Sequence, residues 1–255
     1  MNYLTAVHTD IGIRKDTNQD SALVMEAETE LGRVLLTVIC DGMGGLAKGE
    51  VASSAVVNAF ANWFEKEFPM VLTSGKISDA IHESWEQIVF SCNDKICDYG
   101  KKHGVSLGTT LVALMIIGDQ YYIINIGDSR VYCITDGVYC LTKDQTFVQR
   151  EMELGRMTYE QAMKSPQRSV LLQCIGASTF IDPEFLTGKC KPNQVFMLCS
   201  DGFRHVISEQ EIFQSMNPGV LVNEKVMLQK EVFLVELNKQ RMERDNITVA
   251  LVKTV

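Results

Sequence analysis

Four aspartates stand at the ends of apolar, strand-like runs, where carboxylates could do chemistry. Asp41 follows VLLTVIC, Asp128 follows YYIINIG and Asp201 follows VFMLCS, while Asp245 precedes NITVALV. Any one of them could simply form a turn. If the strands are neighbours, however, the carboxylates converge, and their repulsion must be relieved by solvent, by pairing or by cations. Oxygen-only ligands favour hard ions such as Mg2+ or Mn2+ over zinc.

The first of these aspartates opens a glycine-rich stretch, CDGMGGLAKGE (residues 40–50), with three glycines in the four positions after Asp41. Glycine loses the most conformational entropy on folding, so its clustering indicates a backbone that bends sharply or is approached closely. Three interpretations follow: a phosphate cradle, a metal site, or a tight turn from a strand to a helix.

The bulk composition narrows the class of protein. Of the 255 residues, 46% are hydrophobic and 22% charged, and the net charge of −8 disfavours a nucleic-acid partner. The longest apolar runs fall far short of the ~20 residues of a membrane span, and the amino terminus has no apolar stretch of signal-peptide length. The eight cysteines are scattered without a C-x-x-C pair, which favours core thiols in a reducing compartment. We therefore expect a cytoplasmic protein with no membrane or nucleic-acid partner.

Strand-like runs and helical stretches occur in separate groups along the chain. Apolar runs bounded by turn residues predict strands at 3–9, 21–27, 33–40, 109–117, 120–127, 130–135, 137–142, 195–200 and 246–252. Helices are predicted at 49–68, 77–100 and 224–240, the second with apolar residues every three or four positions. This grouping indicates an α+β fold with antiparallel sheets. With no internal repeat or linker, residues 1–255 are expected to form one domain.

Six short motifs in a fixed order give a resemblance to a known family. They are TDIGIRKDTNQDS (9–21), DGMGG (41–45), LGTTLVA (107–113), GDSR (127–130), SDG (200–202) and DNITV (245–249). With them the chain, from Thr9 to Val252, resembles the metal-dependent serine/threonine protein phosphatases of type 2C, and their bacterial branch in particular. The resemblance implies a four-layer α-β-β-α sandwich of two antiparallel sheets flanked by helices. It also implies two Mn2+ or Mg2+ ions in a cleft at one end.

The resemblance implies roles for individual residues as well. Asp41 would bridge the two metal ions, and the carbonyl of Gly42 would complete the ligands of one. Asp201 and Asp245 would bind the first metal, and Asp20 would act there through bound water. The glycines would then let a main-chain oxygen face a cation, so the metal-site interpretation of residues 40–50 is preferred over the phosphate cradle.

Three further positions bear on the implied metal chemistry. Asp128 would join Asp201 at a third, weaker metal ion found in bacterial relatives. Gln19 stands where the family often has Glu, and this removes one negative charge beside the second metal. Met43 stands where animal relatives carry His, so this position supplies no side-chain acid and water must protonate the leaving group.

Two neighbouring residues are candidates for binding the substrate phosphate. The family uses an Arg five residues before the Asp of its first motif, and counting back from Asp20 reaches Lys15, with Arg14 one position earlier. Lys offers a point charge and Arg a bidentate fork, so the two are not equivalent. A local shift of the chain favours Arg14, and one of the two is expected to bind phosphate.

The polar segment 143–169 resembles the flap of the family, a mobile insertion that contacts substrate beside the cleft. Two histidines that relatives often carry near its ends are absent here. The histidines that the chain does contain, His8, His82, His103 and His205, show no ligand-like spacing. They are interpreted as having no role in the site.

The intact set of aspartates leads to a prediction of function. The chain is expected to hydrolyse phosphoserine and phosphothreonine on cytosolic proteins, by attack of a water held between two metal ions, as a monomer that opposes a serine/threonine kinase. One alternative is a non-catalytic module of the same fold that binds phosphoproteins or regulatory partners. Another is a phosphatase for a small metabolite or for one dedicated regulatory partner.

Overall fold

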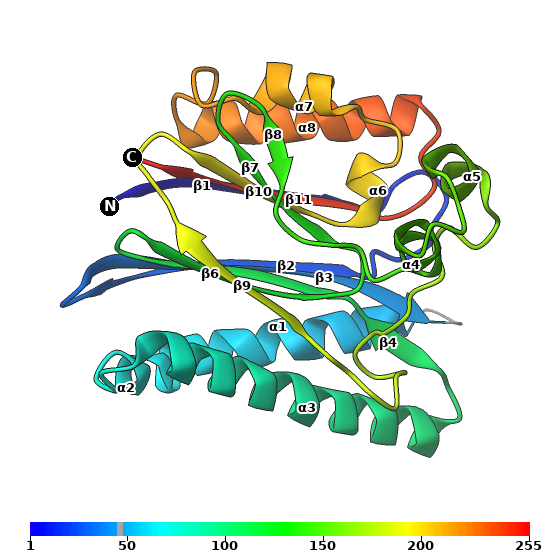
Figure 1. Cartoon of the computed structure of the whole chain (residues 1–255), viewed down its shortest axis with the longest axis horizontal. Coiled ribbons are helices and arrows are strands. Elements are labelled where there is room, and N and C mark those ends of the chain that lie inside the picture. Colours follow the sequence, from blue (N-terminus) through cyan, green and yellow to red (C-terminus); the bar gives the residue numbers. More distant parts are fainter. Residues whose placement is uncertain (45–47) are drawn as a thin grey trace.

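Two antiparallel sheets pack face to face, and helices cover the outer face of each (Figure 1). The computed structural model describes residues 1–44 and 48–255, so Gly45, the last glycine of the DGMGG motif, lies outside the described residues. The α+β sandwich of two helix-covered antiparallel sheets predicted from the sequence is confirmed.

The strands of the first sheet run in the order β1-β11-β10-β7-β8, and those of the second in the order β2-β3-β5-β6-β9. The first sheet contains β1 (Tyr3–Asp10), β7 (Arg130–Ile134), β8 (Val138–Cys140), β10 (Val195–Cys199) and β11 (Ile247–Thr254). The second contains β2 (Asp20–Thr29), β3 (Gly32–Gly44), β5 (Leu111–Ile117), β6 (Gln120–Ile126) and β9 (Glu184–Lys189), and β4 (Leu107–Thr109) pairs with the end of β3.

The helices form the two outer layers and the connections at one end. The second sheet is covered by α1 (Gly49–Lys66), α2 (Phe68–Val71) and α3 (Ile77–His103), and the first by α7 (Glu209–Met216) and α8 (Glu224–Gln240). The remaining helices are α4 (Phe147–Glu153), α5 (Tyr159–Lys164) and α6 (Asp201–Arg204). None of the helices in the described ranges is long and apolar enough to cross a membrane.

The alternation of side chains along each strand separates the three cores of the molecule. In β3, Leu35 and Ile39 face the other sheet, while Leu36 and Val38 pack toward α1 and α3. Because both faces of β3 are covered, its apolar run is continuous rather than alternating. By the same alternation, the next residue on the inter-sheet face after Ile39 is Asp41.

Several elements differ from those expected. Strand β3 continues past the expected end at Cys40 to Gly44, because its last three residues pair with β4. The edge strand β9 was not expected, since its sequence EFLTGK is half-exposed and lacks a continuous apolar pattern. Helix α8 begins and ends at the predicted residues, and α3 begins at its predicted residue.

One carboxyl group is buried in the helical layer over the first sheet. Glu231 of α8 is fully buried, and neither of its carboxylate oxygens has a hydrogen-bond partner among the described residues. Burial raises the pKa of Glu231 well above its ordinary value, an effect that the nearby backbone of Leu251 only partly offsets. The folded protein therefore favours the neutral acid at this position.

Replacing Glu231 by Gln should stabilise the protein in a pH-dependent way. Above the ordinary Glu pKa of ~4.3 the unfolded chain loses this proton while the native state keeps it, so wild-type stability falls as pH rises. We expect the variant to gain on the order of 1–3 kcal/mol in free energy of unfolding at pH 7, and almost nothing at pH 4. Urea unfolding at both pH values measures this, and a gain independent of pH would contradict it.

Candidate metal centre

Two aspartates of the second sheet lie directly opposite each other. Asp20, the first residue of β2, is the register partner of Asp41 on β3, and both strands direct these positions to the inter-sheet face. Like charges opposite each other on paired strands destabilise a sheet. This pair therefore indicates a place where a cation is needed.

The first sheet holds Asp20 in position from the other side. Ser200 Oγ and Thr248 Oγ1 donate hydrogen bonds to Asp20 Oδ2, at 2.9 and 2.6 Å. Ser200 directly follows β10 and precedes Asp201, the first residue of α6. The contact fixes one oxygen of Asp20 across the gap between the sheets, while Asp20 Oδ1 is buried with no hydrogen-bond partner among the described residues.

The LGTT and GDSR motifs fix the backbone of Asp41. Its amide donates to Thr110 Oγ1 at 2.9 Å, and its carbonyl accepts from the Thr110 amide at 2.9 Å and from Thr109 Oγ1 at 3.0 Å. The hydroxyls of Thr110 and Ser129 lie 2.8 Å apart. These contacts use only main-chain atoms of Asp41, so its carboxylate stays available to the site.

Close approach of backbones, not a sharp bend, explains the glycine after Asp41. A Cβ on Gly42 would collide with the carbonyl oxygens of Gln19 and Gly49, and the Gly42 amide donates to the Gln19 carbonyl at 3.2 Å. The chain stays extended here, as part of β3. The backbone therefore does not turn at Gly42, and the ligand role of the Gly42 carbonyl stays a prediction.

Asp245 is paired with one of the two candidate phosphate-binding residues. Lys15 Nζ lies 2.7 Å from Asp245 Oδ1, and the two side chains are 41% and 37% exposed. Burial alone would lower the pKa of Lys15, but the hydrogen bond to Asp245 raises it, with smaller contributions from Asp41 and Asp201. Arg14, the candidate favoured from the sequence, is exposed and makes no hydrogen bond or ion pair with the described residues. The structure therefore brings Lys15, and not Arg14, to the aspartates.

The loop that carries Lys15 is braced by Asn246 of the DNITV motif. Asn246 Nδ2 donates to the carbonyls of Ile11 and Thr17, at 2.9 and 3.1 Å, and its Oδ1 accepts from the Gln19 amide at 2.9 Å. This loop connects β1 of one sheet to β2 of the other. Asn246 therefore sets the position of Lys15 relative to Asp245, its neighbour in the chain.

His205, interpreted from the sequence as having no role, contacts a candidate ligand. Its Nε2 lies 3.2 Å from Asp201 Oδ2, and its Nδ1 lies 3.2 Å from Glu243 Oε2. Burial would lower the pKa of His205, but the two carboxylates raise it to about 9. The signal in the sequence was its position four residues after Asp201, which places both side chains on one face of a helical turn.

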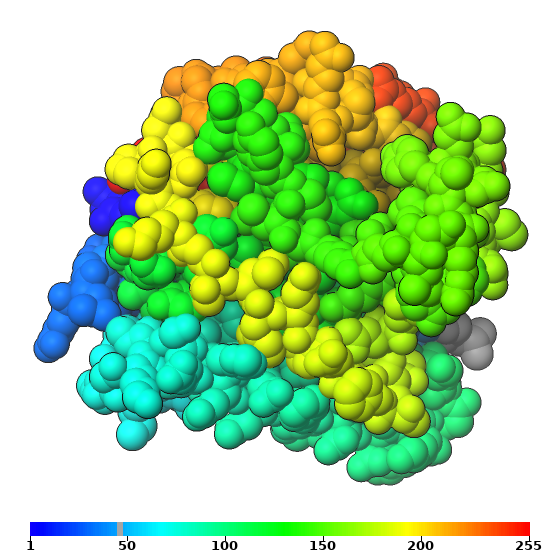
Figure 2. Space-filling view, in the orientation of Figure 1, coloured from blue at the N-terminus to red at the C-terminus, as the bar shows by residue number. Residues whose placement is uncertain are grey.

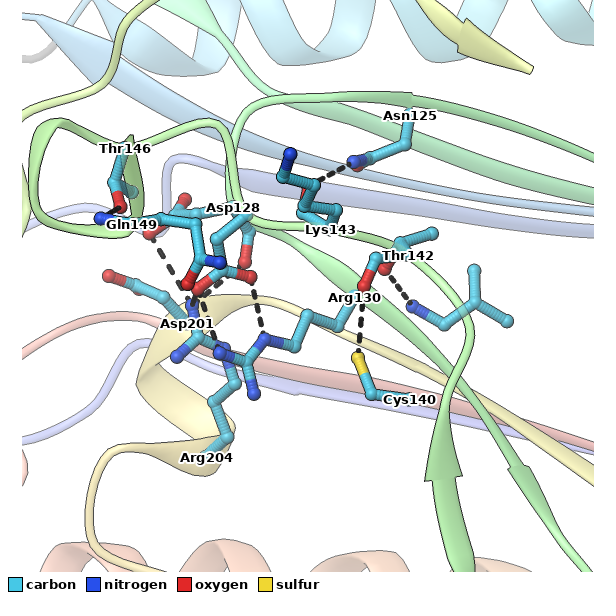
Figure 3. Close-up of polar contacts among 12 residues, drawn as sticks. Asn125, Asp128, Arg130, Cys140, Thr142, Lys143, Thr146, Gln149, Asp201 and Arg204 are labelled. Atoms are coloured by element: carbon cyan, nitrogen blue, oxygen red, sulfur yellow. Dashed lines mark hydrogen bonds and ion pairs between the residues drawn. The ribbon is translucent and has the colours of Figure 1, made fainter. Parts of the chain in front are cut away.

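Asp128 lies in the link that carries the chain from β6 of one sheet to β7 of the other. Its carbonyl accepts a hydrogen bond from Arg204 Nη2 at 2.9 Å, and its Oδ2 lies 3.5 Å from the same nitrogen. Arg204 Nη2 also lies 3.3 Å from Asp144 Oδ2, and Arg130 binds both oxygens of Asp144, at 2.6 and 2.8 Å. Figure 3 shows the two arginines reaching this cluster from α6 and β7.

The electrostatics of the aspartates are those of a site that requires positive charge. Burial, and then the neighbouring carboxylates, raise the pKa of Asp41 well above its ordinary range. Burial raises the pKa of Asp20 and of Asp128 to about 7, and Asp201 adds to both shifts. Burial opposes the ionisation of Asp201 too, but its contact with His205 lowers its pKa to about 2.

These residues fit hard divalent ions. The buried Oδ1 atoms of Asp20 and Asp201 have no hydrogen-bond partner within the described part of the chain, and carboxylate oxygens are the ligands that Mg2+ and Mn2+ prefer. Across residues 1–44 and 48–255, no three His, Cys, Asp or Glu side chains already form a closed metal cage. Mg2+ does not need one, since it keeps several waters and takes only one or two carboxylates at a site.

The predicted flap segment 143–169 lies outside both sheets, at the end of the molecule where α6 begins (Figure 1). The segment contains the helices α4 and α5, and Figure 2 shows it, in yellow-green, as a projecting mass at this end. A cavity of about 430 Å3 opens beside α4, lined among others by Gln149, Arg150 and Phe180.

Comparison with known proteins gives consistent matches over nearly the whole chain. The family model described as protein phosphatase 2C matches residues 13–234. A putative protein phosphatase 2C-type from Streptococcus pyogenes is 30% identical over 250 residues, which cover 97% of this chain and 96% of that protein.

Solved structures match as well. A serine/threonine phosphatase from S. agalactiae superposes with a TM-score of 0.83 at 30% identity, covering 100% of both chains. The catalytic domain of the serine/threonine protein phosphatase PstP, in complex with two manganese ions, superposes with a TM-score of 0.79 at 27% identity, covering 99% of this chain and 98% of that one.

Proposed function

Because the chain belongs to the protein phosphatase 2C family, we propose that it is a metal-dependent phosphatase that hydrolyses phosphoserine and phosphothreonine on proteins. The observation that carries the proposal is the meeting of aspartates from both sheets at one end of the sandwich, with Asp20 and Asp41 from one sheet and Asp201 and Asp245 beside strands of the other. The two manganese ions of the PstP structure support a two-metal centre here.

Two Mn2+ or Mg2+ ions would be held by Asp41, Asp201 and Asp245, with the Gly42 carbonyl, and with Asp20 acting through water. When bound, such ions lower the pKa of a water molecule for attack on phosphorus and offset the charge that develops there. Hydrogen bonds fix the backbone of Asp41 and one oxygen of Asp20 before any metal ion binds. Positions fixed before binding cost no reorganisation during the reaction.

The substrate phosphate would be bound by a basic side chain beside these aspartates. Lys15 is the candidate that the geometry supports, because its ammonium group already lies against Asp245. Met43 lies in β3 opposite Gly108 and offers no acidic proton, so solvent water protonates the leaving oxygen. Asp128 was expected at a third metal ion, and it contacts Arg204 of α6.

The natural substrates are proposed to be cytosolic phosphoproteins, including targets of a serine/threonine kinase, and the active form a monomer. The cavity beside α4 supports a peptide substrate, since it lies next to Asp144, which contacts Arg204 of α6. The cysteines support a reducing compartment, because five of the eight are buried thiols and none is disulfide-bonded.

Hydrolysis of para-nitrophenyl phosphate by metal-stripped protein, titrated with Mn2+ and Mg2+, tests the proposal. We expect turnover to appear with metal and to vanish in Asp201→Asn, whereas Asp98→Asn, on the exposed face of α3, should behave as wild type. A panel of phosphopeptides beside small phosphate esters then separates a protein phosphatase from a metabolite phosphatase. Folded protein without turnover at any metal concentration would favour the non-catalytic phosphoprotein-binding module instead.

A further inference from the structure

The guanidinium group of Arg204 lies directly beside Asp128. Arg204 is largely buried, and its Nη2 atom lies against both the carbonyl and the carboxylate of Asp128. Asp128 and Arg204 side chains are only 9% and 14% exposed, so solvent screens this contact little. Arg204 follows Asp201 by three residues in α6, so one helical turn carries both a candidate metal ligand and this cation.

The charges around Asp128 balance without any metal ion. Two carboxylates, Asp128 and Asp144, contact two guanidinium groups, Arg130 and Arg204 (Figure 3). The carboxylate of Asp201, which also acts on Asp128, is paired with His205. A divalent ion bound to Asp128 would add two positive charges to a buried cluster that is already neutral, and it would face Arg204 at close range. Such a like-charge contact is strongly unfavourable where the effective dielectric constant is low.

The charges around Asp41 do not balance in this way. Four carboxylates, those of Asp20, Asp41, Asp201 and Asp245, lie together, and Asp128 adds its charge to the field at Asp41. The cations that contact them among the described residues are the ammonium of Lys15 and the imidazole of His205, and Arg204 acts on Asp201 from its place beside Asp128. The excess negative charge is therefore concentrated between Asp41 and its neighbours. Divalent ions are therefore attracted more strongly to Asp41 and its neighbours than to Asp128, which contacts Arg204 directly.

We propose that Arg204 is a built-in cation that takes the place of a third metal ion at Asp128, so that this protein holds two metal ions and not three. The inference rests on the proposed two-metal function. In this proposal Asp128 has a role other than metal binding. Asp128 and Asp144 both contact Arg204, and Asp144 lies near the start of the segment 143–169, so these contacts join that segment to α6. Arg204 thus ties the base of this segment to the helix that begins with Asp201.

The number of bound Mn2+ ions tests the inference without reference to activity. Metal-stripped protein is mixed with saturating Mn2+, and electron paramagnetic resonance measures the Mn2+ that stays free, which gives the number of bound ions by difference. The proteins compared are wild type, Arg204→Gln, Arg204→Lys, Arg130→Gln and Asp128→Asn. Arg204→Gln removes the charge at Asp128, whereas Arg204→Lys keeps it. Arg130→Gln is the matched control, because Arg130 contacts Asp144 and not Asp128. Circular dichroism shows which variants fold.

We expect two ions in wild type, Arg204→Lys, Arg130→Gln and Asp128→Asn, and a third, weaker ion in Arg204→Gln. Adding Asp128→Asn to Arg204→Gln should remove that third ion. The inference is overturned if wild type binds a third ion that Asp128→Asn abolishes, or if folded Arg204→Gln still binds only two. If Arg204→Gln does not fold, wild type and Asp128→Asn decide alone. Fewer than two ions in wild type would instead overturn the proposed function, and with it the premise of this inference.

Discussion

The Asp41→Asn variant is expected to be almost inactive and yet more stable than wild type in the absence of metal. Asp41 lies opposite Asp20 in the sheet, and burial and neighbouring carboxylates disfavour its ionisation. Removing this charge relieves the repulsion, and we expect a gain on the order of 1–3 kcal/mol in free energy of unfolding. The same change removes the proposed bridging ligand, so kcat/KM should fall about 1,000-fold or more, which corresponds to about 4 kcal/mol of transition-state stabilisation.

The two effects are separated by unfolding in urea with EDTA and again with Mn2+. Wild type should gain stability from Mn2+ by mass action, because the folded state binds the ion, and Asp41→Asn should gain far less. Asp98→Asn serves as the control for the same chemical change on an exposed helix face. A variant that loses stability in EDTA would contradict the repulsion at Asp41. One that keeps near-normal turnover with Mn2+ would show that Asp41 is not a metal-bridging ligand.

The fold could be predicted where burial acts on contiguous residues. The run VLLTVIC is apolar throughout because β3 is covered by the other sheet on one face and by helices on the other. Helix α8 carries enough local pattern to define both of its ends. The edge strand β9 has neither feature: its pairing with β6 depends on tertiary position, and its residues are half-exposed.

Of the residues in the candidate site, the aspartates at the strand ends were the ones that the sequence pattern could predict. Asp20 and Asp41 are 21 residues apart in the chain, but the hairpin of β2 and β3 brings them into register, and the sequence pattern marks both strands. His205 was missed because its partners are carboxylates and not other histidines. Arg204 was missed because its contact with Asp128 joins residues 76 positions apart, beside the paired strands β7 and β10, and no local spacing reports such a contact.

The choice between Lys15 and Arg14 shows a further limit of spacing. Counting along the motif assigns Lys15 the position, and the chemistry of a bidentate fork favours Arg14. The loop of residues 11–19 decides, because Asn246 fixes its backbone at Ile11, Thr17 and Gln19. These contacts join the first and last motifs of the chain, so they depend on the completed fold.

Lys15→Ala should therefore lower kcat/KM about 100-fold, whereas Arg14→Ala should change it by less than about threefold. Lys15 Nζ lies 2.7 Å from Asp245 Oδ1, within reach of a phosphate bound beside the aspartates, while Arg14 makes no contact with them. The measurement is the Mn2+-saturated rate with para-nitrophenyl phosphate and with a phosphothreonine peptide.

Mn2+ affinity distinguishes phosphate binding by Lys15 from a simpler role. In the metal-free protein Lys15 competes for Asp245, so Lys15→Ala should bind Mn2+ more tightly while turning over more slowly. If Lys15 only neutralises Asp245 when no metal is bound, the variant would bind Mn2+ more tightly with no loss of kcat/KM. A larger loss of kcat/KM in Arg14→Ala than in Lys15→Ala would instead mean that substrate binding shifts the loop by one residue, so that Arg14 takes the place of Lys15. The positive charge that holds the phosphate would then be the fork that the family uses, and not the ammonium that lies beside Asp245 in the free protein.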